Sequence, residues 1–226
     1  MIKTGLFALA LAAALPPGAG AASIIFSNFG PSLAYDVTQG NPVGNDFAGD
    51  NAAEGDSFIP TASADFGSVS VALSCVVGCP AADSFVIALT ADMSDAPGAV
   101  LESFSFTGAT LGALGTYNTP VTATSVLQPL LTAGTRYWIT VASSPAFAIA
   151  WNDNSTSSTV DQAVSSDGGS TWFSPSGMTP SAFDVLSTTT PEPSAALLLS
   201  GGLLMILWGR RLRLPVVALK RAHPRS

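Results

Sequence analysis

The sequence predicts an all-β fold for the middle of the chain, an antiparallel β-sandwich of jelly-roll-like form. Helical periodicity is nearly absent between Ala22 and Thr189. Short apolar, β-branched or aromatic runs recur there between Gly, Pro, Asn, Asp and Ser residues. Several runs alternate apolar and polar residues, as in Val69-Ser70-Val71, which is typical of antiparallel strands with one buried face and one hydrated face. About ten such runs in one domain favour two packed sheets.

The expected strands cover most of this segment. In chain order they are Ser23–Phe29, Asp56–Ile59, Gly67–Ser74, Ser84–Thr90, Val100–Phe106, Val121–Ser125, Arg136–Ala142, Phe147–Trp151, Val160–Ser165 and Ala182–Leu186. We expect a turn at Asp95–Gly98, because Pro and Gly favour turn positions. We expect a hairpin turn at Ser166–Ser170, because its Asp and Gly residues tolerate positive φ.

Residues 1–21 have the three regions of a secretory signal peptide. Lys3 supplies the positive charge, Leu6–Leu15 is an apolar run, and Ala19-Gly20-Ala21 is a small-residue cleavage site. Such a run is too short to span a bilayer. We therefore expect export and a mature chain that begins near Ala22; the alternative is an N-terminal core helix.

A second apolar segment near the C-terminus predicts a membrane anchor. The sixteen residues Ser194–Gly209 carry no charge. As a helix they would be about 24 Å long, which is short for a hydrocarbon core of about 30 Å. Arg210, Arg211 and Arg213 follow directly, and such arginines stay on the cytoplasmic side and stop transfer. We expect one transmembrane helix followed by a basic cytoplasmic tail over residues 214–226; the alternative is a buried helix of a soluble domain.

The order of features in residues 190–213 resembles a known sorting signal. Pro191, Glu192 and Pro193 precede the apolar run, and the arginine cluster follows it. This order resembles the PEP-CTERM signal of exported proteins of Gram-negative bacteria. The resemblance implies processing by an exosortase-type protease, with a transient stay in the inner membrane before delivery to the cell surface or extracellular matrix. The tail from Leu214 to Ser226 is longer than in that family.

The segment between the two signals, residues 22–189, is strongly acidic. Fourteen of the fifteen Asp and Glu residues lie in it, whereas Arg136 is its one basic residue, so its net charge is near −13. Nucleic-acid partners and anionic membrane surfaces are disfavoured, since both are bound through Lys and Arg. The segment has no histidine, because His223 lies in the tail. This excludes histidine-based triads and histidine zinc sites there.

Cys75 and Cys79 are the two cysteines of the chain. In an exported protein we expect them to form a local disulfide. The alternative is a redox or metal pair, which the three-residue spacing and the absence of further Cys or His disfavour.

Acidic residues suggest a Ca²⁺ site, the one cofactor that the sequence offers. Carboxylate and amide oxygens are the ligands that Ca²⁺ takes. The candidates are Asp46, Asp50, Glu54 and Asp56, which we expect in a loop, together with Asp153. The alternative is a solvated acidic loop, because neither stretch has EF-hand spacing.

Tryptophans offer a candidate surface for stacking on sugar rings. Trp151 and Trp172 are the candidates, with Trp172 beside a turn and therefore expected to be the more exposed. The alternative, which we favour for tryptophans within apolar strands, is packing in the core.

The middle of the chain also resembles a known surface domain. Asp56-Ser57-Phe58, the Val69–Leu73 strand, Phe85–Thr90 with its turn, Leu131–Trp138 and Ser165–Trp172 follow in an order similar to the choice-of-anchor R domain. That family resembles a bacterial surface β-sandwich with alternative C-terminal anchors, and it implies no catalytic residues.

These observations lead to one main expectation about function and two alternatives. We expect a non-catalytic protein of the cell surface or extracellular matrix that contributes to biofilm or exopolysaccharide-associated structure. The alternatives are a Ca²⁺-assisted carbohydrate-binding module and a glycan-active hydrolase, for which paired carboxylates would be required.

Overall fold

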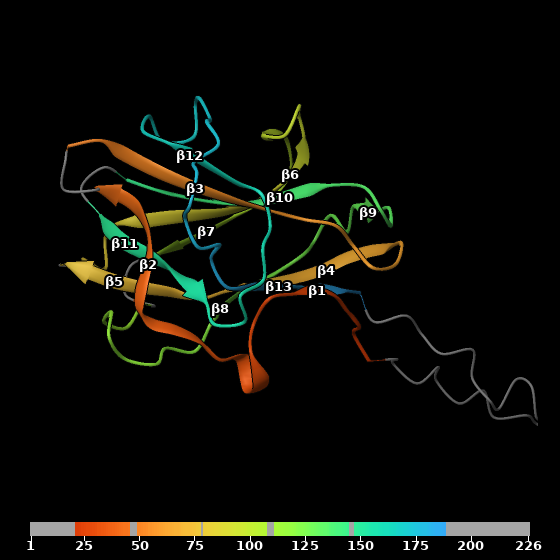
Figure 1. Cartoon of the computed structure of the whole chain (residues 1–226), viewed down its shortest axis with the longest axis horizontal. Helices are drawn as coiled ribbons and strands as arrows, with labels where there is room; N and C mark the ends of the chain where they lie inside the picture. The colour runs from red at the N-terminus through yellow and green to blue at the C-terminus, as the bar shows by residue number, and fades with distance from the viewer. Residues whose placement is uncertain (1–20, 46–48, 78, 108–110, 145–146, 189–226) are drawn as a thin grey trace, which may run out of the picture. The chain divides into compact units, whose positions relative to one another are not determined.

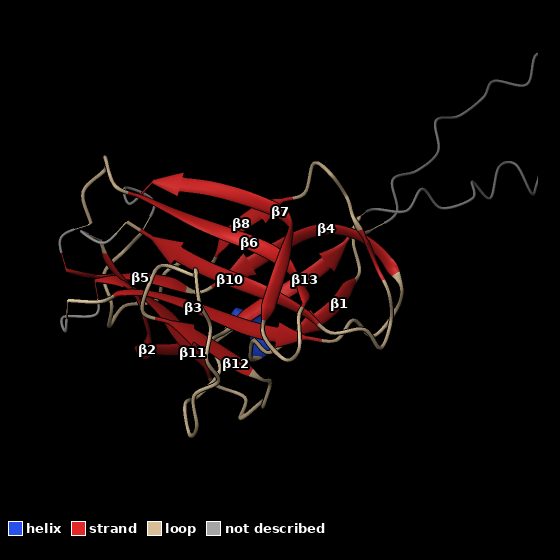
Figure 2. Cartoon of the chain, turned by 90° about the horizontal axis from the view of Figure 1, so that it is seen from above, coloured by secondary structure: helices blue, strands red, loops and turns tan. Residues whose placement is uncertain are grey.

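A computed structural model of the chain describes residues 21–45, 49–77, 79–107, 111–144 and 147–188. The segment Ala22–Thr189 forms one structural unit, which is almost entirely strand and loop (Figure 2). One short 3-10 helix, η1 (Pro31–Leu33), is the helical element among the described residues. Asp46, the sorting motif Pro191–Pro193 and the three arginines that follow the apolar run lie outside the described residues. Within the described part, no helix has the length and apolar character needed to cross a bilayer.

The smaller of two antiparallel sheets contains the first and last strands of the described chain (Figure 1). Its order is β1 (Ile24–Ser27), β13 (Phe183–Ser187), β4 (Ala64–Val71) and β8 (Val121–Thr124), and the two-residue β9 (Leu130–Leu131) also pairs with β4. The N-terminal and C-terminal ends of this domain are therefore neighbours in one sheet.

The larger sheet is also antiparallel in every strand pair described. Its order is β5 (Leu73–Val77), β11 (Ala148–Asn154), β2 (Tyr35–Asn45), β3 (Asn51–Phe58), β10 (Tyr137–Ser143), β6 (Ser84–Asp92) and β7 (Pro97–Thr107), while β12 (Gln162–Ser165) also pairs with β3. The prediction of an all-β, antiparallel domain is confirmed.

The main core is formed by apolar side chains from both sheets, as in a β-sandwich. Val69, Phe183 and Val185 come from the smaller sheet, and Ile87 and Ile139 come from the larger one. Alternation along each strand places these residues on one face.

One predicted strand proves to be two. The run Gly67–Ser74 is divided at Ala72, where β4 of the smaller sheet ends and β5 of the larger sheet begins. The amide of Ala72 donates to the Ala182 carbonyl at 3.1 Å, and its carbonyl accepts from the Asn152 amide at 2.8 Å. These bonds satisfy the backbone of Ala72 while the chain crosses from one sheet to the other.

The two cysteines form the expected disulfide. Cys75 lies in β5, and its Cα atom is 5.9 Å from that of Cys79. The bond therefore closes a short loop at one end of the larger sheet.

Candidate functional site

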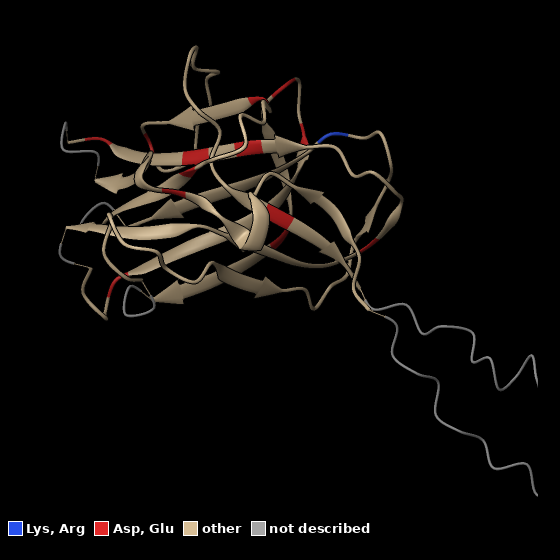
Figure 3. Cartoon of the chain, turned by 60° about the horizontal axis from the view of Figure 1, so that its bottom comes forward, with Lys and Arg blue, Asp and Glu red and all other residues tan. Residues whose placement is uncertain are grey.

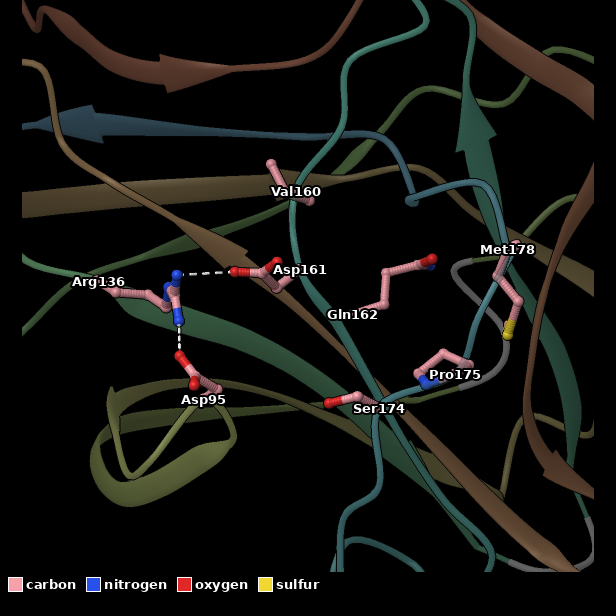
Figure 4. A pocket seen from close by; sticks show the side chains of 9 residues that line it. Asp95, Arg136, Val160, Asp161, Gln162, Ser174, Pro175 and Met178 are labelled. Carbon is pink, nitrogen blue, oxygen red and sulfur yellow. Dashed lines mark hydrogen bonds and ion pairs between the residues drawn. The ribbon is translucent and has the colours of Figure 1, made fainter.

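The candidate site begins with an open, polar pocket beside the start of β12. The pocket has a volume of about 510 Å³. Its lining is mostly polar and includes one cation (Figure 4). The lining residues are Asp95, Arg136, Val160, Asp161, Gln162, Ser174, Pro175, Gly177 and Met178.

Arg136 joins two loops at the edge of this pocket. It directly precedes β10, and its guanidinium pairs with Asp95 in the β6–β7 turn and with Asp161 just before β12. The distance from Arg136 Nη2 to Asp161 Oδ2 is 2.8 Å. As the one basic residue of the acidic segment, Arg136 stands out among the carboxylates in Figure 3. With two carboxylates already facing it, the guanidinium adds no net positive charge to the pocket.

Behind the pocket lies a group of acids, which we call the carboxyl layer: the buried Glu54 and Asp56 on β3 and the half-buried Asp153 on β11. Glu54 is 1% exposed and Asp56 is 0% exposed. In the antiparallel register Asp56 faces Ile139 and Glu54 faces Val141. Directly paired residues point to the same side of a sheet, so both acids lie on the face that carries the apolar core.

Gln162 of β12 and the segment 179–181 contact the carboxyl layer. Gln162 Nε2 donates to Glu54 Oε1 and to the Thr179 carbonyl, each at 3.1 Å. The amide of Ser181 donates to Asp56 Oδ2 at 3.0 Å, and Ser181 also forms a bridge with Asp153. Gln162 lines the pocket and is hydrogen-bonded to Glu54 of the carboxyl layer, so it connects the two.

Two oxygen atoms of the carboxyl layer are left without a hydrogen-bond partner among the described residues, Asp56 Oδ1 and Asp153 Oδ1. Burial raises the pKa of Asp56 to about 8, and the hydrogen bonds from Ser181 only partly offset this effect. Burial raises the pKa of Glu54 well above its usual range, and the negative charge of Asp56 raises it further. Burial, followed by repulsion from Asp36, raises the pKa of Asp153 to about 6. At pH 7 the neutral acid is therefore the favoured form of Asp56, the pKa of Glu54 is shifted in the same direction, and Asp153 remains mainly ionised.

The five acidic residues predicted as Ca²⁺ ligands do not all lie together. The structure brings together Glu54, Asp56 and Asp153, whereas Asp50 is exposed before β3 and Asp46 lies outside the described residues. The expected loop is wrong for Glu54, which lies on a buried strand, whereas Asp56 lies on that strand as the expected strand Asp56–Ile59 predicted. Over the ranges that the structure describes, no group of three or more His, Cys, Asp or Glu residues is arranged to hold a metal ion.

The two candidate tryptophans lie in different environments, and Trp172 is the more exposed of them, as expected. Trp151 is 0% exposed, its Nε1 donates to the Ala182 carbonyl at 3.0 Å, and its ring packs edge-on against Phe183. It therefore cannot present a face to a sugar, because its ring belongs to the core. Trp172 is partly exposed and lies over Gly169, where an added Cβ would be 3.3 Å from the indole. Trp172 is not among the residues that line the Arg136 pocket.

Arg136, Asp161 and Gln162 were not singled out by the sequence as site residues. The one available signal was the isolation of Arg136 among fourteen acids. Nothing in the local pattern around Gln162 indicates that its amide bonds to a buried carboxyl group.

Comparison with known proteins gives no further assignment: no family model matches the chain, and no curated protein matches it.

Proposed function

We propose that the chain is an exported, non-catalytic protein of the cell surface or extracellular matrix, in which a jelly-roll-like sandwich lies between an N-terminal signal peptide and a C-terminal PEP-CTERM-type anchor. The observation that carries the proposal is the order of segments: signal peptide, acidic domain, Pro191-Glu192-Pro193, apolar run, arginines. The disulfide between Cys75 and Cys79 supports it, because disulfides persist in oxidising compartments outside the cytoplasm. In this role the protein contributes to biofilm or exopolysaccharide-associated structure in a Gram-negative bacterium.

The burial of the carboxyl layer supports a non-catalytic role. A glycosidase needs two carboxyl groups on either side of an accessible glycosidic bond. Glu54 and Asp56 have perturbed pKa values, but they are 1% and 0% exposed and are covered by Gln162 and Ser181. A polysaccharide chain does not reach them in this conformation.

Cell fractionation with intact-mass analysis tests the proposal. We expect the mature protein to lack residues 1–21, to carry the disulfide and to have lost the segment after the Pro191–Pro193 motif. A matched variant, Glu192→Ala, should leave the apolar segment attached and the protein in the inner membrane. Recovery of full-length protein from the cytosol would overturn the proposal.

A second candidate function is carbohydrate binding, and the Arg136 pocket is the observation that favours it. Carboxylates accept hydrogen bonds from sugar hydroxyls, while the Arg136 guanidinium, which has five N–H groups, donates them. Pro175 and Met178 add apolar surface for the C–H groups of a sugar ring. The neutralised Arg136 and the acidic domain favour an uncharged saccharide over an anionic one.

A glycan array with and without chelator tests this second function. The variant Arg136→Ala should abolish binding, and Trp172→Phe, outside the pocket, should leave it unchanged. Loss of binding on chelation would show that Ca²⁺ assists, and absence of binding at high protein concentration would exclude the module.

A further inference from the structure

The loop after β8 and the first residue of β9 together carry three exposed apolar side chains within five residues. Val126 is 84% exposed, Leu127 is 69% exposed and Leu130 is 64% exposed. Single exposed apolar residues are normal on protein surfaces, whereas a local group of them needs an explanation. We call these three residues the apolar tip.

The apolar tip belongs to a loop with a defined backbone. Glu102 Oε1 accepts from the amides of Val126 and Leu127 at 2.7 and 3.0 Å. The Ser125 amide donates to the Gly67 carbonyl at 2.8 Å, and the Phe66 amide donates to the Pro129 carbonyl at 2.9 Å. The loop is thus bonded to β7 and β4 on both sides of the tip, and the exposure of its apolar side chains is a property of the folded state.

The apolar tip lies beside the two ends of the domain. A hollow of about 260 Å³ is lined by Ser125 and Gln128 from the loop and by Ala22, Ser187 and Thr188 from the chain ends. The amide of Thr188 donates to the Asp65 carbonyl of β4 at 2.9 Å, so the chain leaves the domain alongside that strand. β8 and β13 pair with opposite edges of β4, which places the loop about 10 Å from the exit of the chain, two strand spacings away.

The exit of the chain is close in sequence to the apolar run. Seven residue steps separate Thr188 from Ala195, and an extended chain covers at most about 25 Å over that length. When residues 194–209 are in a bilayer, as the proposed function requires, the end of the domain that carries the apolar tip is held within reach of the lipid surface.

We propose that Val126, Leu127 and Leu130 form a lipid-contacting surface that enters the interface of the bilayer during the anchored stage. The inference rests on the proposed function and adds to it an orientation of the domain on the membrane. Residues 125–131 carry no charge of their own, so the tip itself brings no ionic side chain into the interface. The acidic domain disfavours anionic lipid, and the surface that fits is therefore a zwitterionic bilayer.

A position-specific fluorescence experiment on the full chain tests the proposal. The native cysteines are joined in the disulfide and are the only two in the sequence, so Leu127→Cys accepts one polarity-sensitive label. The labelled chain is reconstituted in phosphatidylcholine vesicles that contain a lipid-borne quencher. The control is Phe173→Cys, because Phe173 is apolar and 57% exposed but belongs to the bridge with β12. Val126→Cys provides a second tip position.

We expect a blue-shifted, lipid-quenched signal at 127 and 126 and an aqueous signal at 173. If both tip positions give an aqueous signal in a chain that resists extraction from the vesicles, the proposed lipid contact is wrong. The proposed membrane anchor is then unaffected. A chain that is extracted from the vesicles at alkaline pH would refute the anchor and the tip together. A blue shift that forms without lipid and grows with protein concentration would assign the tip to contact between copies, and would also overturn the proposal.

Discussion

The amide of Ser181 donates a 3.0 Å hydrogen bond to Oδ2 of Asp56, while Oδ1 of the same carboxyl group has no partner among the described residues. The carboxyl group is fully buried, so its unpartnered oxygen is disfavoured as part of an anion. Burial raises the pKa of Asp56 to about 8, which makes the neutral acid the favoured form in the folded protein at pH 7. The hydrogen bond thus connects a protonated carboxyl group of the core to Ser181, in the segment before β13.

Folding stability should fall as the pH rises. The pKa of Asp56 is near 4 in the unfolded chain and about 8 in the folded one, so the folded state binds more protons between these values. The contribution is fully present below pH 4 and is lost as the pH rises toward 8, by at most about 1.4 kcal/mol per pH unit for one proton. Urea unfolding at pH 5, 7 and 9 measures this slope.

The variant Asp56→Asn should flatten that slope. Its amide oxygen can accept the Ser181 hydrogen bond, and its NH₂ group replaces the unpartnered oxygen by a neutral group. Asp167→Asn is the control, because the pKa of Asp167 is shifted in the opposite direction. Hydrogen bonds from Ser165 and Thr171 lower it to about 2. Its effect should be confined to acid, since a depressed pKa contributes stability that is lost as the pH falls. Equal slopes in Asp56→Asn and the parent protein would contradict the protonated state of Asp56 in the folded protein.

Removal of the Glu102 carboxylate should loosen the β8–β9 loop. Burial raises the pKa of Glu102, but the hydrogen bonds from Ser125, Leu127 and Val126 outweigh this effect and leave the pKa lowered. Glu102→Ala leaves two amides without their charged acceptor, and we expect a loss of about 1.5–3 kcal/mol in unfolding free energy. Hydrogen exchange should increase at residues 125–128, whereas Glu102→Gln, which keeps an acceptor oxygen, should show a smaller increase.

Loss of the disulfide should destabilise the domain only modestly. Cys75 and Cys79 are separated by 4 in sequence, and closing so short a loop contributes about 2 kcal/mol by the chain-entropy argument. Denaturant unfolding of the Cys75→Ser, Cys79→Ser double variant measures the loss. Unchanged unfolding of the parent protein on reduction would show that the bond does not constrain the unfolded chain.

Trp151 and Trp172 should respond in opposite ways to replacement by Phe. Trp151→Phe removes the buried donor of the Ala182 carbonyl and leaves space in the core, which should cost about 1–3 kcal/mol. Trp172→Phe is the matched control at a partly exposed position, and its cost should be within about 0.5 kcal/mol. Thermal unfolding of both variants distinguishes a core tryptophan from a surface one.

Many of the strands could be predicted from runs of alternating apolar and polar residues. Ser84–Thr90, Val100–Phe106 and Arg136–Ala142 correspond to β6, β7 and β10, since each run has a clear apolar face that only a strand period explains. The sheet change at Ala72 was hidden, because the alternation continues through the crossing from Val71 to Leu73 and gives no local signal.

The strands that the sequence did not reveal are those with poor intrinsic preference. β2 contains Gly40, Pro42 and Gly44, which are typical of turns. Most of β3 reads as an acidic loop, because Glu54 and Asp56 are rarely buried. Their place is set by partners distant in sequence, Gln162 and Ser181, and no local pattern contains that information. The disulfide was predictable because its two cysteines are close in sequence. The pocket at Arg136 was not, because Arg136 pairs with Asp95 and Asp161, which are distant in sequence.

The position of β13 within its sheet has a mechanical consequence. This last strand is flanked by β1 on one side and β4 on the other. When the domain is tethered through its C-terminal end, tension produced by fluid flow enters along β13 and loads both ladders of hydrogen bonds at once. An edge strand peeled from its end would lose its bonds one after another, whereas β13 must shear past two neighbours. A tether at the C-terminal end would thus pull on a strand that is held on both sides.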